Sequence, residues 1–272
     1  MIVSLVVTGI IVALAAGAGA GQLRVLRGIS EISMVRTQVS QAALVTAGVL
    51  RDVASRHHIL VALDSAIEVA VTTGSSITCR SDTARVVVAR PSAAGNTIGA
   101  FPETPQPGDG VEILDVDSTV GHISARVSHA PVAAACERFP WAAGWNVAIA
   151  ELFVVQAGMP VRFTRRLRLS VYRASDSRWY LGMREWNAAQ GRFNTIQPVA
   201  GPLLPYGGQS SGFRLQYRDS TGALLVAPDP SRIALVTVVA RGDSRRPVRI
   251  AGMRSANGMA HRDSALVSIP IR

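Results

Sequence analysis

The chain has 272 residues, a formal net charge of +10 and a hydrophobic fraction of 48%. A strongly basic chain can bind nucleic acid or an anionic membrane surface. Here, however, all 28 basic residues are arginines scattered along the chain, and aromatic residues, at 5%, are too few for a base-stacking surface. We therefore expect no nucleic-acid partner. A chain of this length can bury the core of one large or two small domains.

The N-terminal segment is apolar, since the first 21 residues contain no charged side chain. About 20 such residues, at roughly 1.5 Å rise per residue, span the ~30 Å hydrocarbon core of a bilayer. No proline interrupts the chain before Pro91, so a helix that begins here can continue unbroken. The sequence therefore predicts a transmembrane half-helix over residues 1–21. A second interpretation is a signal-peptidase site in the small residues Ala16–Ala20, after which the rest of the chain would be secreted.

Residues 22–57 continue the helical pattern, with an apolar stripe on one side and charged or amide side chains on the other. Such a stripe can pack against a second helix as the seam of a coiled coil does. The residues that we predict to form this helix-assembly face are Leu23, Leu26, Ile29, Ile32, Val35 and Val39.

Residues 58–272 change to a period of two, which is typical of strands with one buried face. Stretches rich in proline and glycine separate several of the segments. The predicted fold class is therefore α+β, with a long N-terminal helix packed on a β-rich, mainly antiparallel head. The predicted strands are Ile67–Val71, Ser76–Cys79, Arg85–Ala89, Gly110–Val116, His122–Val127, Val147–Val155, Val161–Tyr172, Arg178–Glu185, Gly212–Tyr217, Ile233–Ala240 and Ala265–Ile271.

The chain has two cysteines, Cys79 and Cys136, and both follow the apolar segment. Their separation fits no metal-binding motif. In an oxidising compartment they can pair, which would close a long loop. We predict a disulfide between them, and the alternative is two unrelated buried thiols.

Three short patterns suggest chemistry, and each has a simpler interpretation. Residues 208–212 match the G-x-S-x-G pattern around Ser210, but an alternating strand, and no helix, follows them. A run of carboxylates could supply oxygen ligands to Ca²⁺, although its spacing is not that of an EF-hand. His57 and His58 have no acidic or cysteine partner nearby in the sequence. We therefore expect no catalytic residue, no cofactor and no metal site. The carboxylates are Asp109, Glu112, Asp115 and Asp117.

Several segments together resemble a known superfamily. They are Val3-Ser-Leu-Val-Val-Thr-Gly-Ile-Ile-Val-Ala-Leu-Ala, Gln41-Ala-Ala-Leu with Val49-Leu-Arg-Asp-Val, Trp179-Tyr-Leu-Gly-Met-Arg-Glu, Gly212-Phe-Arg-Leu-Gln-Tyr-Arg-Asp-Ser-Thr-Gly and Ile233-Ala-Leu-Val-Thr-Val-Val-Ala-Arg. The chain resembles type IV pilins and type II secretion pseudopilins, most of all the PilW-type minor pilin and the J-type minor pseudopilin. The resemblance implies a structural subunit that initiates or caps a pilus or pseudopilus and has no small-molecule substrate. Its implied partners are other subunits, through the N-terminal helix, and the bacterial inner membrane, with the head in the periplasm or outside.

Members of this superfamily begin with a basic leader, a Gly-Phe-Thr-Leu-type cleavage site and a nearby glutamate, and the printed sequence starts inside the corresponding helix. We therefore expect that a leader and the first mature residues precede Met1. The alternative function is a secreted or membrane-anchored extracytoplasmic β-rich binding module.

Overall fold

The computed structural model describes most of the chain. The described ranges are 2–53, 56–82, 85–90, 99–114, 122–137, 139, 143–150, 156–208, 210–244 and 262–271. In the helix, the side chains of residues 2–14 lie outside the described part, as do those of Ala18, Ala20, Gly21 and Arg24.

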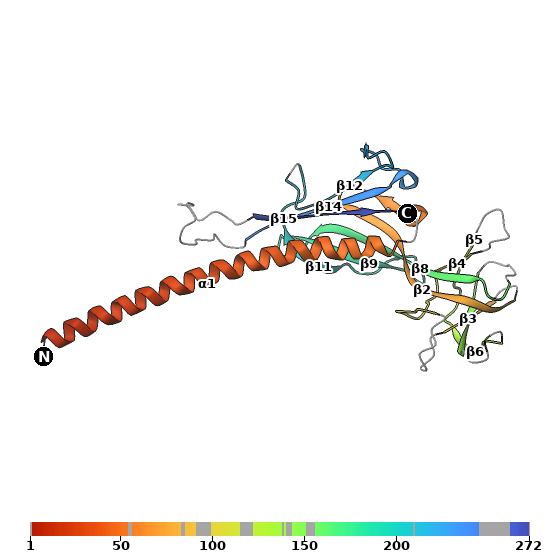
Figure 1. The fold of residues 1–272 in the computed structure, drawn as a ribbon, viewed down its shortest axis with the longest axis horizontal. Helices are drawn as coiled ribbons and strands as arrows, with labels where there is room; N and C mark the ends of the chain where they lie inside the picture. The colour runs from red at the N-terminus through yellow and green to blue at the C-terminus, as the bar shows by residue number, and fades with distance from the viewer. Residues whose placement is uncertain are drawn as a thin grey trace.

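One helix, α1 (Ile2–Arg51), begins the chain. Its C-terminal half lies against the β-structure, whereas its N-terminal half extends away from it (Figure 1). The absence of proline allows this length, and Arg51 in the last turn places a positive charge at the negative end of the helix dipole. The short 3-10 turn η1 (Arg56–His58) follows and leads into the first strand.

The larger sheet has eleven strands, and all pairs described within it are antiparallel. Its central path runs β10-β9-β8-β2-β3-β7-β6, while β1 pairs with β2, β11 with β9, β4 with β8 and β5 with β4. The strands are β1 (Ile59–Ala62), β2 (Ala66–Asp82), β3 (Arg85–Ala89), β4 (Gly110–Leu114), β5 (His122–Arg126), β6 (Val132–Ala135), β7 (Ala143–Ala148), β8 (Pro160–Arg173), β9 (Trp179–Asn187), β10 (Arg192–Phe193) and β11 (Gln197–Leu203).

A smaller sheet of four strands has the order β13-β12-β14-β15 and is also antiparallel. Its strands β14 and β15 contact α1, and β11 of the larger sheet contacts the same helix, so both sheets hold the C-terminal half of α1 (Figure 1). The 3-10 turn η2 (Pro230–Arg232) precedes β14. The strands are β12 (Phe213–Arg218), β13 (Leu224–Leu225), β14 (Leu235–Asp243) and β15 (Arg262–Pro270).

Two hydrophobic cores lie along the long strands β2 and β8. The first core joins α1 to β1, β9, β11, β12, β14 and β15, and it includes Leu167 and Leu169 of β8. The second core joins β3, β4, β5 and β7, and it includes Val161 and Phe163 of β8. The register between β2 and β8 shifts at Thr72–Gly74, where such a bulge bends the strand. The long strands therefore cross from one core into the other (Figure 1).

The fold class predicted from the sequence, α+β with a long helix packed on a β-rich head, is wrong. Strands account for 51% of the structure and helix for 19%, so the protein is mainly β with one α-helix among the described residues. One reason is that β2 is much longer than the period-two pattern predicted, with 17 residues in one strand where the pattern gave two short ones. Strands such as β11 and β6 also form where the sequence predicted none.

Two further predictions are wrong: the transmembrane half-helix over residues 1–21 and the location in the inner membrane. Within the described part of the chain, no helix is long and apolar enough to cross a bilayer. The described side chains of α1 begin at Ala15, and from there alternating alanine and glycine lead into a segment that contains Arg27, Glu31 and Arg36. The side chains of residues 2–14, on which much of the prediction depended, lie outside the described residues.

Candidate assembly surface

The predicted helix-assembly face divides into an exposed part and a buried part. Leu23, Leu26 and Ile29 are 55%, 62% and 52% exposed, and Ile32 is half-buried. Val35 and Val39, in contrast, are only 3% and 1% exposed. The sequence could not separate these two groups, because both follow the same helical spacing. Only the first group can contact another chain.

Val35 and Val39 are buried against the chain's own strand β14. Gly242 of that strand lies so close to the helix that a Cβ atom there would be 2.9 Å from Val39 Cγ2 and 3.4 Å from Val35 Cγ1. The absence of a side chain at Gly242 therefore lets the helix approach the sheet. Further along the helix, Ala42, Ala47 and Leu50 belong to the same core. The C-terminal half of α1 is thus a fixed part of the body.

One exposed apolar residue, Leu44, lies on the outer side of the docked half of α1. Leu44 is 63% exposed, although its neighbours Ala42 and Ala43 are fully buried. Leu26 and Leu44 are about five turns apart at 3.6 residues per turn, so they lie on the same side of the helix. Around the helix axis, buried Val39 is rotated by more than a third of a turn from Leu26 and Leu44. Between the two leucines, however, this side of the helix carries the exposed polar residues Ser33 and Thr37, so the exposed apolar side chains gather in the N-terminal half.

A hollow of about 430 Å³ lies between α1 and β15, near the point where the helix leaves the body. Its walls carry opposite charges, Arg36 on the helix and Asp263 on the strand. It could receive a side chain of a molecule that packs along the helix. Its lining residues are Ile32, Arg36, Val39, Ser40, Asp263 and Ser264.

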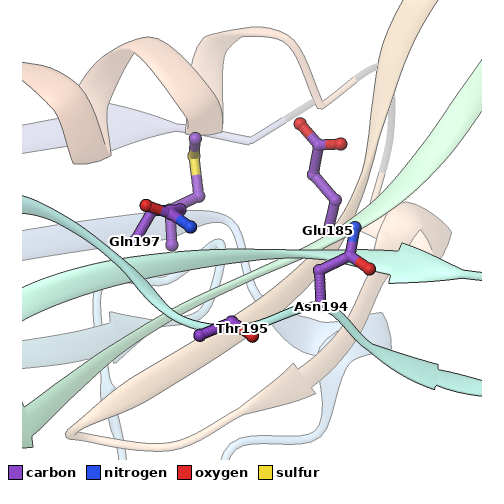
Figure 2. A pocket seen from close by; sticks show the side chains of 5 residues that line it. Glu185, Asn194, Thr195 and Gln197 are labelled. Carbon is purple, nitrogen blue, oxygen red and sulfur yellow. The ribbon is translucent and has the colours of Figure 1, made fainter.

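A second hollow of about 430 Å³ lies on strands β9 and β11 and on the segment before β11 (Figure 2). Gln197 pairs with Met183 in the sheet. The backbone N–H of Asn194 donates a hydrogen bond of 2.9 Å to the backbone carbonyl of Glu185. These pairings bring one carboxylate and several polar side chains to one surface. A Glu185 carboxylate oxygen is 4.0 Å from Arg165 Nη1. The hollow is lined by Met183, Glu185, Asn194, Thr195 and Gln197.

The predicted disulfide between Cys79 and Cys136 is confirmed, since the two residues are bonded in the structure. Cys79 lies near the end of β2 and Cys136 directly after β6, and both are buried with Ala89 in a small hydrophobic cluster of their own. The bond closes a loop with a sequence separation of 57 residues. It therefore ties the outer strand β6 to the long strand β2.

His57, His58 and Glu112 come together, although the sequence indicated no acidic partner for the two histidines. His58 Nε2 lies 2.5 Å and His57 Nε2 lies 3.8 Å from Glu112 Oε1. The ligand-type atoms of all three residues lie within 4.8 Å of one another. Burial opposes ionisation of Glu112, but the hydrogen bond with His58 and the nearby positive charges hold its pKa below the ordinary value. These are the residues that could hold a metal ion in the described part of the chain.

The acidic run and the G-x-S-x-G pattern, which the sequence analysis singled out, form no joint site among the described residues. Asp109 pairs with Arg165 and does not face Glu112, while Asp115 and Asp117 lie outside the described residues. Ser210 is exposed in the segment between β11 and β12. Strand β12 follows it, where a nucleophile elbow has a helix.

No protein-family model, no curated protein and no solved structure matches the chain. The relationship to pilins and pseudopilins therefore stays a prediction from the sequence.

Proposed function

We propose that the chain is a structural subunit of a filament, of the minor pilin or pseudopilin type, and that it assembles through the exposed apolar face of α1. The observation that carries the proposal is the division of this helix. One half is fixed in the body by two sheets, and the other half extends from the body with Leu23, Leu26 and Ile29 exposed (Figure 1).

Apolar exposure on an extended helix supports packing against further helices. Burying one leucine side chain is worth about 1.5–3 kcal/mol, so three or four such residues supply a substantial driving force for association. These side chains alternate with polar residues in the manner of a helix seam. The hollow between α1 and β15 follows these residues along the helix, at Ile32 and Arg36.

The rigid attachment of the helix also supports a structural role. In an assembly held by the helix, the body must keep a fixed orientation relative to it, and the contact of Val35 and Val39 with Gly242 provides such an attachment. The disulfide between Cys79 and Cys136 also joins β2 to the end of β6, and such a bond is suited to an oxidising compartment.

The proposal can be tested by replacing Leu26 with a photo-crosslinking amino acid in cells that express the full chain. We expect crosslinks to a protein whose own N-terminal residues form an apolar helix. The same replacement at Val226, which is 92% exposed in the body, is the matched control and should give no such product. Identical products at both positions, or none at Leu26, would count against assembly through the helix.

A second measurement distinguishes specific assembly through the helix from non-specific hydrophobic association. The double variant Leu23→Glu and Leu26→Glu should remove the chain from filaments sheared off the cell surface, whereas Val226→Glu should not. Both variants change only exposed residues, so their unfolding curves should match that of the wild type. If the double variant enters filaments normally, or the wild type never does, the proposed function is wrong.

The alternative, an extracytoplasmic binding module, is favoured by the hollow on β9 and β11, where Glu185, Asn194 and Gln197 present polar groups to one surface (Figure 2). Such a module would act without helix packing. It predicts that Glu185→Gln impairs ligand capture while the Leu23 and Leu26 variants behave as the wild type does.

A further inference from the structure

The turn η1 and strand β4 together hold a set of side chains that transition metals bind. The two histidines follow the end of α1, and Glu112 lies in the middle of β4, 54 residues away from His58 in the sequence. Imidazole nitrogen and carboxylate oxygen are ordinary ligands of Zn²⁺ and related first-row divalent ions. Three protein ligands leave a further position for water.

We propose that His57, His58 and Glu112 form a binding site for a divalent first-row transition-metal ion of the Zn²⁺ type. Nothing in the proposed filament role requires this site, and it rests on separate residues.

The present geometry is close to what such an ion needs. Two ligand atoms that bind one tetrahedral Zn²⁺ at about 2.0–2.1 Å lie about 3.4 Å apart. The His57 Nε2 to Glu112 Oε1 distance of 3.8 Å is near this value. The His58 Nε2 to Glu112 Oε1 distance of 2.5 Å must increase by about 1 Å, which breaks one hydrogen bond and replaces it with two metal-ligand bonds.

The surroundings allow an ion to enter. The His57 side chain is 58% exposed, so the site opens to solvent on that side. The nearest cation that the structure gives Glu112 besides the histidines is Arg162, whose Nη1 is 4.0 Å from Oε2. That side chain is 44% exposed and can turn into water when a metal charge is present. His58 is buried and would hold the inner ligand position in place.

Metal binding at this place would connect the two cores. The histidines lie in η1, directly before Ile59 of the first core, whereas β4 belongs to the second core. An ion shared by these elements would fix the second core relative to the helix.

The test uses the full chain, purified without a polyhistidine tag and freed of metal with a chelator. Isothermal titration with ZnCl₂ should show one ion per chain, and Co²⁺ should give a visible absorption band of a four- or five-coordinate site. His57→Ala and Glu112→Gln should each weaken Zn²⁺ binding by roughly tenfold or more, the least that loss of even an outer-shell partner costs in metal sites. His129→Ala, which removes an exposed histidine elsewhere, is the matched control and should bind as the wild type does.

His57→Ala is the decisive variant because its side chain is exposed, and exposed ion pairs contribute only about 0–1 kcal/mol, so its loss should change the metal-free unfolding curve little. Metal-dependent stabilisation, measured as a rise in Tm on adding ZnCl₂, should be present in the wild type and lost in this variant. If the wild type binds no Zn²⁺, or if His57→Ala and Glu112→Gln both bind it as tightly as the wild type, the three residues are an ordinary hydrogen-bonded cluster and the proposal is wrong.

Discussion

The guanidinium of Arg165 donates two hydrogen bonds to the carboxylate of Asp109, from Nε to Oδ1 and from Nη2 to Oδ2, each 2.9 Å long. Both side chains are buried. Arg165 stands on the same face of β8 as Phe163 and Leu167, so this ion pair lies between the two hydrophobic cores. The hydrogen bonds to Asp109 hold the pKa of Arg165 above its ordinary value, although burial opposes them.

Removal of one partner from this pair should be costly. Asp109→Ala leaves the Arg165 charge buried and also removes the acceptor of the Gln106 amide. We expect a loss of about 3 kcal/mol in the free energy of unfolding, at the lower end for buried pairs because Glu103 still contacts Arg165. Guanidinium chloride unfolding measures the loss.

The matched control is Glu137→Ala, which breaks the exposed ion pair with Arg80. Exposed pairs contribute about 0–1 kcal/mol, so this variant should unfold nearly as the wild type does. Equal losses in the two variants would contradict the structural role of the buried pair.

The disulfide between Cys79 and Cys136 should contribute substantially to the stability of the strands β2 and β6 that it joins. In the chain-entropy account, a closed loop of this size stabilises the folded state by about 4 kcal/mol. The double variant Cys79→Ala and Cys136→Ala should therefore unfold at a clearly lower denaturant concentration. Addition of a reductant should lower the wild type to the same midpoint and leave the variant unchanged. A reductant effect on the variant would show that the effect does not come from this bond.

Close packing of α1 on β14 should make Gly242 sensitive to any added side chain. Gly242→Ala places a methyl group 2.9 Å from Val39 Cγ2, and Val39 is a stiff, buried residue. We expect a loss of about 1–3 kcal/mol, the usual cost of overpacking. In a Val39→Ala background the methyl group has room, so the two changes should be coupled by about 0.5–3 kcal/mol. Strict additivity of the two losses would contradict the contact.

The period-two pattern was a good guide to strands that bury one face in a regular way. The strand predicted over Arg85–Ala89 is β3 with the same bounds, and its three valines favour a strand locally. The pattern failed at β11 (Gln197–Leu203), which contains Pro198 and Pro202. Proline lacks an amide hydrogen and is tolerated at a sheet edge, and β11 pairs only with β9 in the described part of the chain.

The pattern also failed to give the length of β2. The register shift near Gly74 breaks the alternation in the middle of the strand, where a Cβ on Gly74 would overlap the Phe101 ring. The sequence pattern therefore predicts two short strands there, whereas β2 is one strand of 17 residues. Such a bend is set by packing between distant segments and leaves no local signal.

The charged clusters could not be found from the sequence, because strand pairing creates them. Glu112 is 54 residues from His58, and Asp109 is 56 residues from Arg165. The sequence showed the carboxylates as one acidic run and the arginines as scattered surface charges. In the structure, alternation along the strand sends Asp109 and Glu112 to different partners. The helix face was predictable as a pattern, but its division at Ile32 depends on where the sheets end.

Tyr217 should make the protein sensitive to high pH. Its side chain is buried in the first core, and its hydroxyl donates a hydrogen bond of 2.8 Å to the Leu63 carbonyl. Burial, together with the negative charge of Asp64, raises the pKa of Tyr217 above its ordinary value. The contribution of this group to stability is therefore fully present below about pH 10, the pKa of an unfolded tyrosine, and is lost as pH rises from there towards the folded pKa.

We therefore expect the free energy of unfolding to fall above about pH 10 by as much as about 1.4 kcal/mol per pH unit from this one group. Tyr217→Phe should lose about 1 kcal/mol at neutral pH, where the hydrogen bond to Leu63 is missing, and should show a shallower decline at high pH. Denaturant unfolding of both proteins at pH 7, 9 and 11 gives the difference directly. A variant that declines as steeply as the wild type would show that another group ionises first.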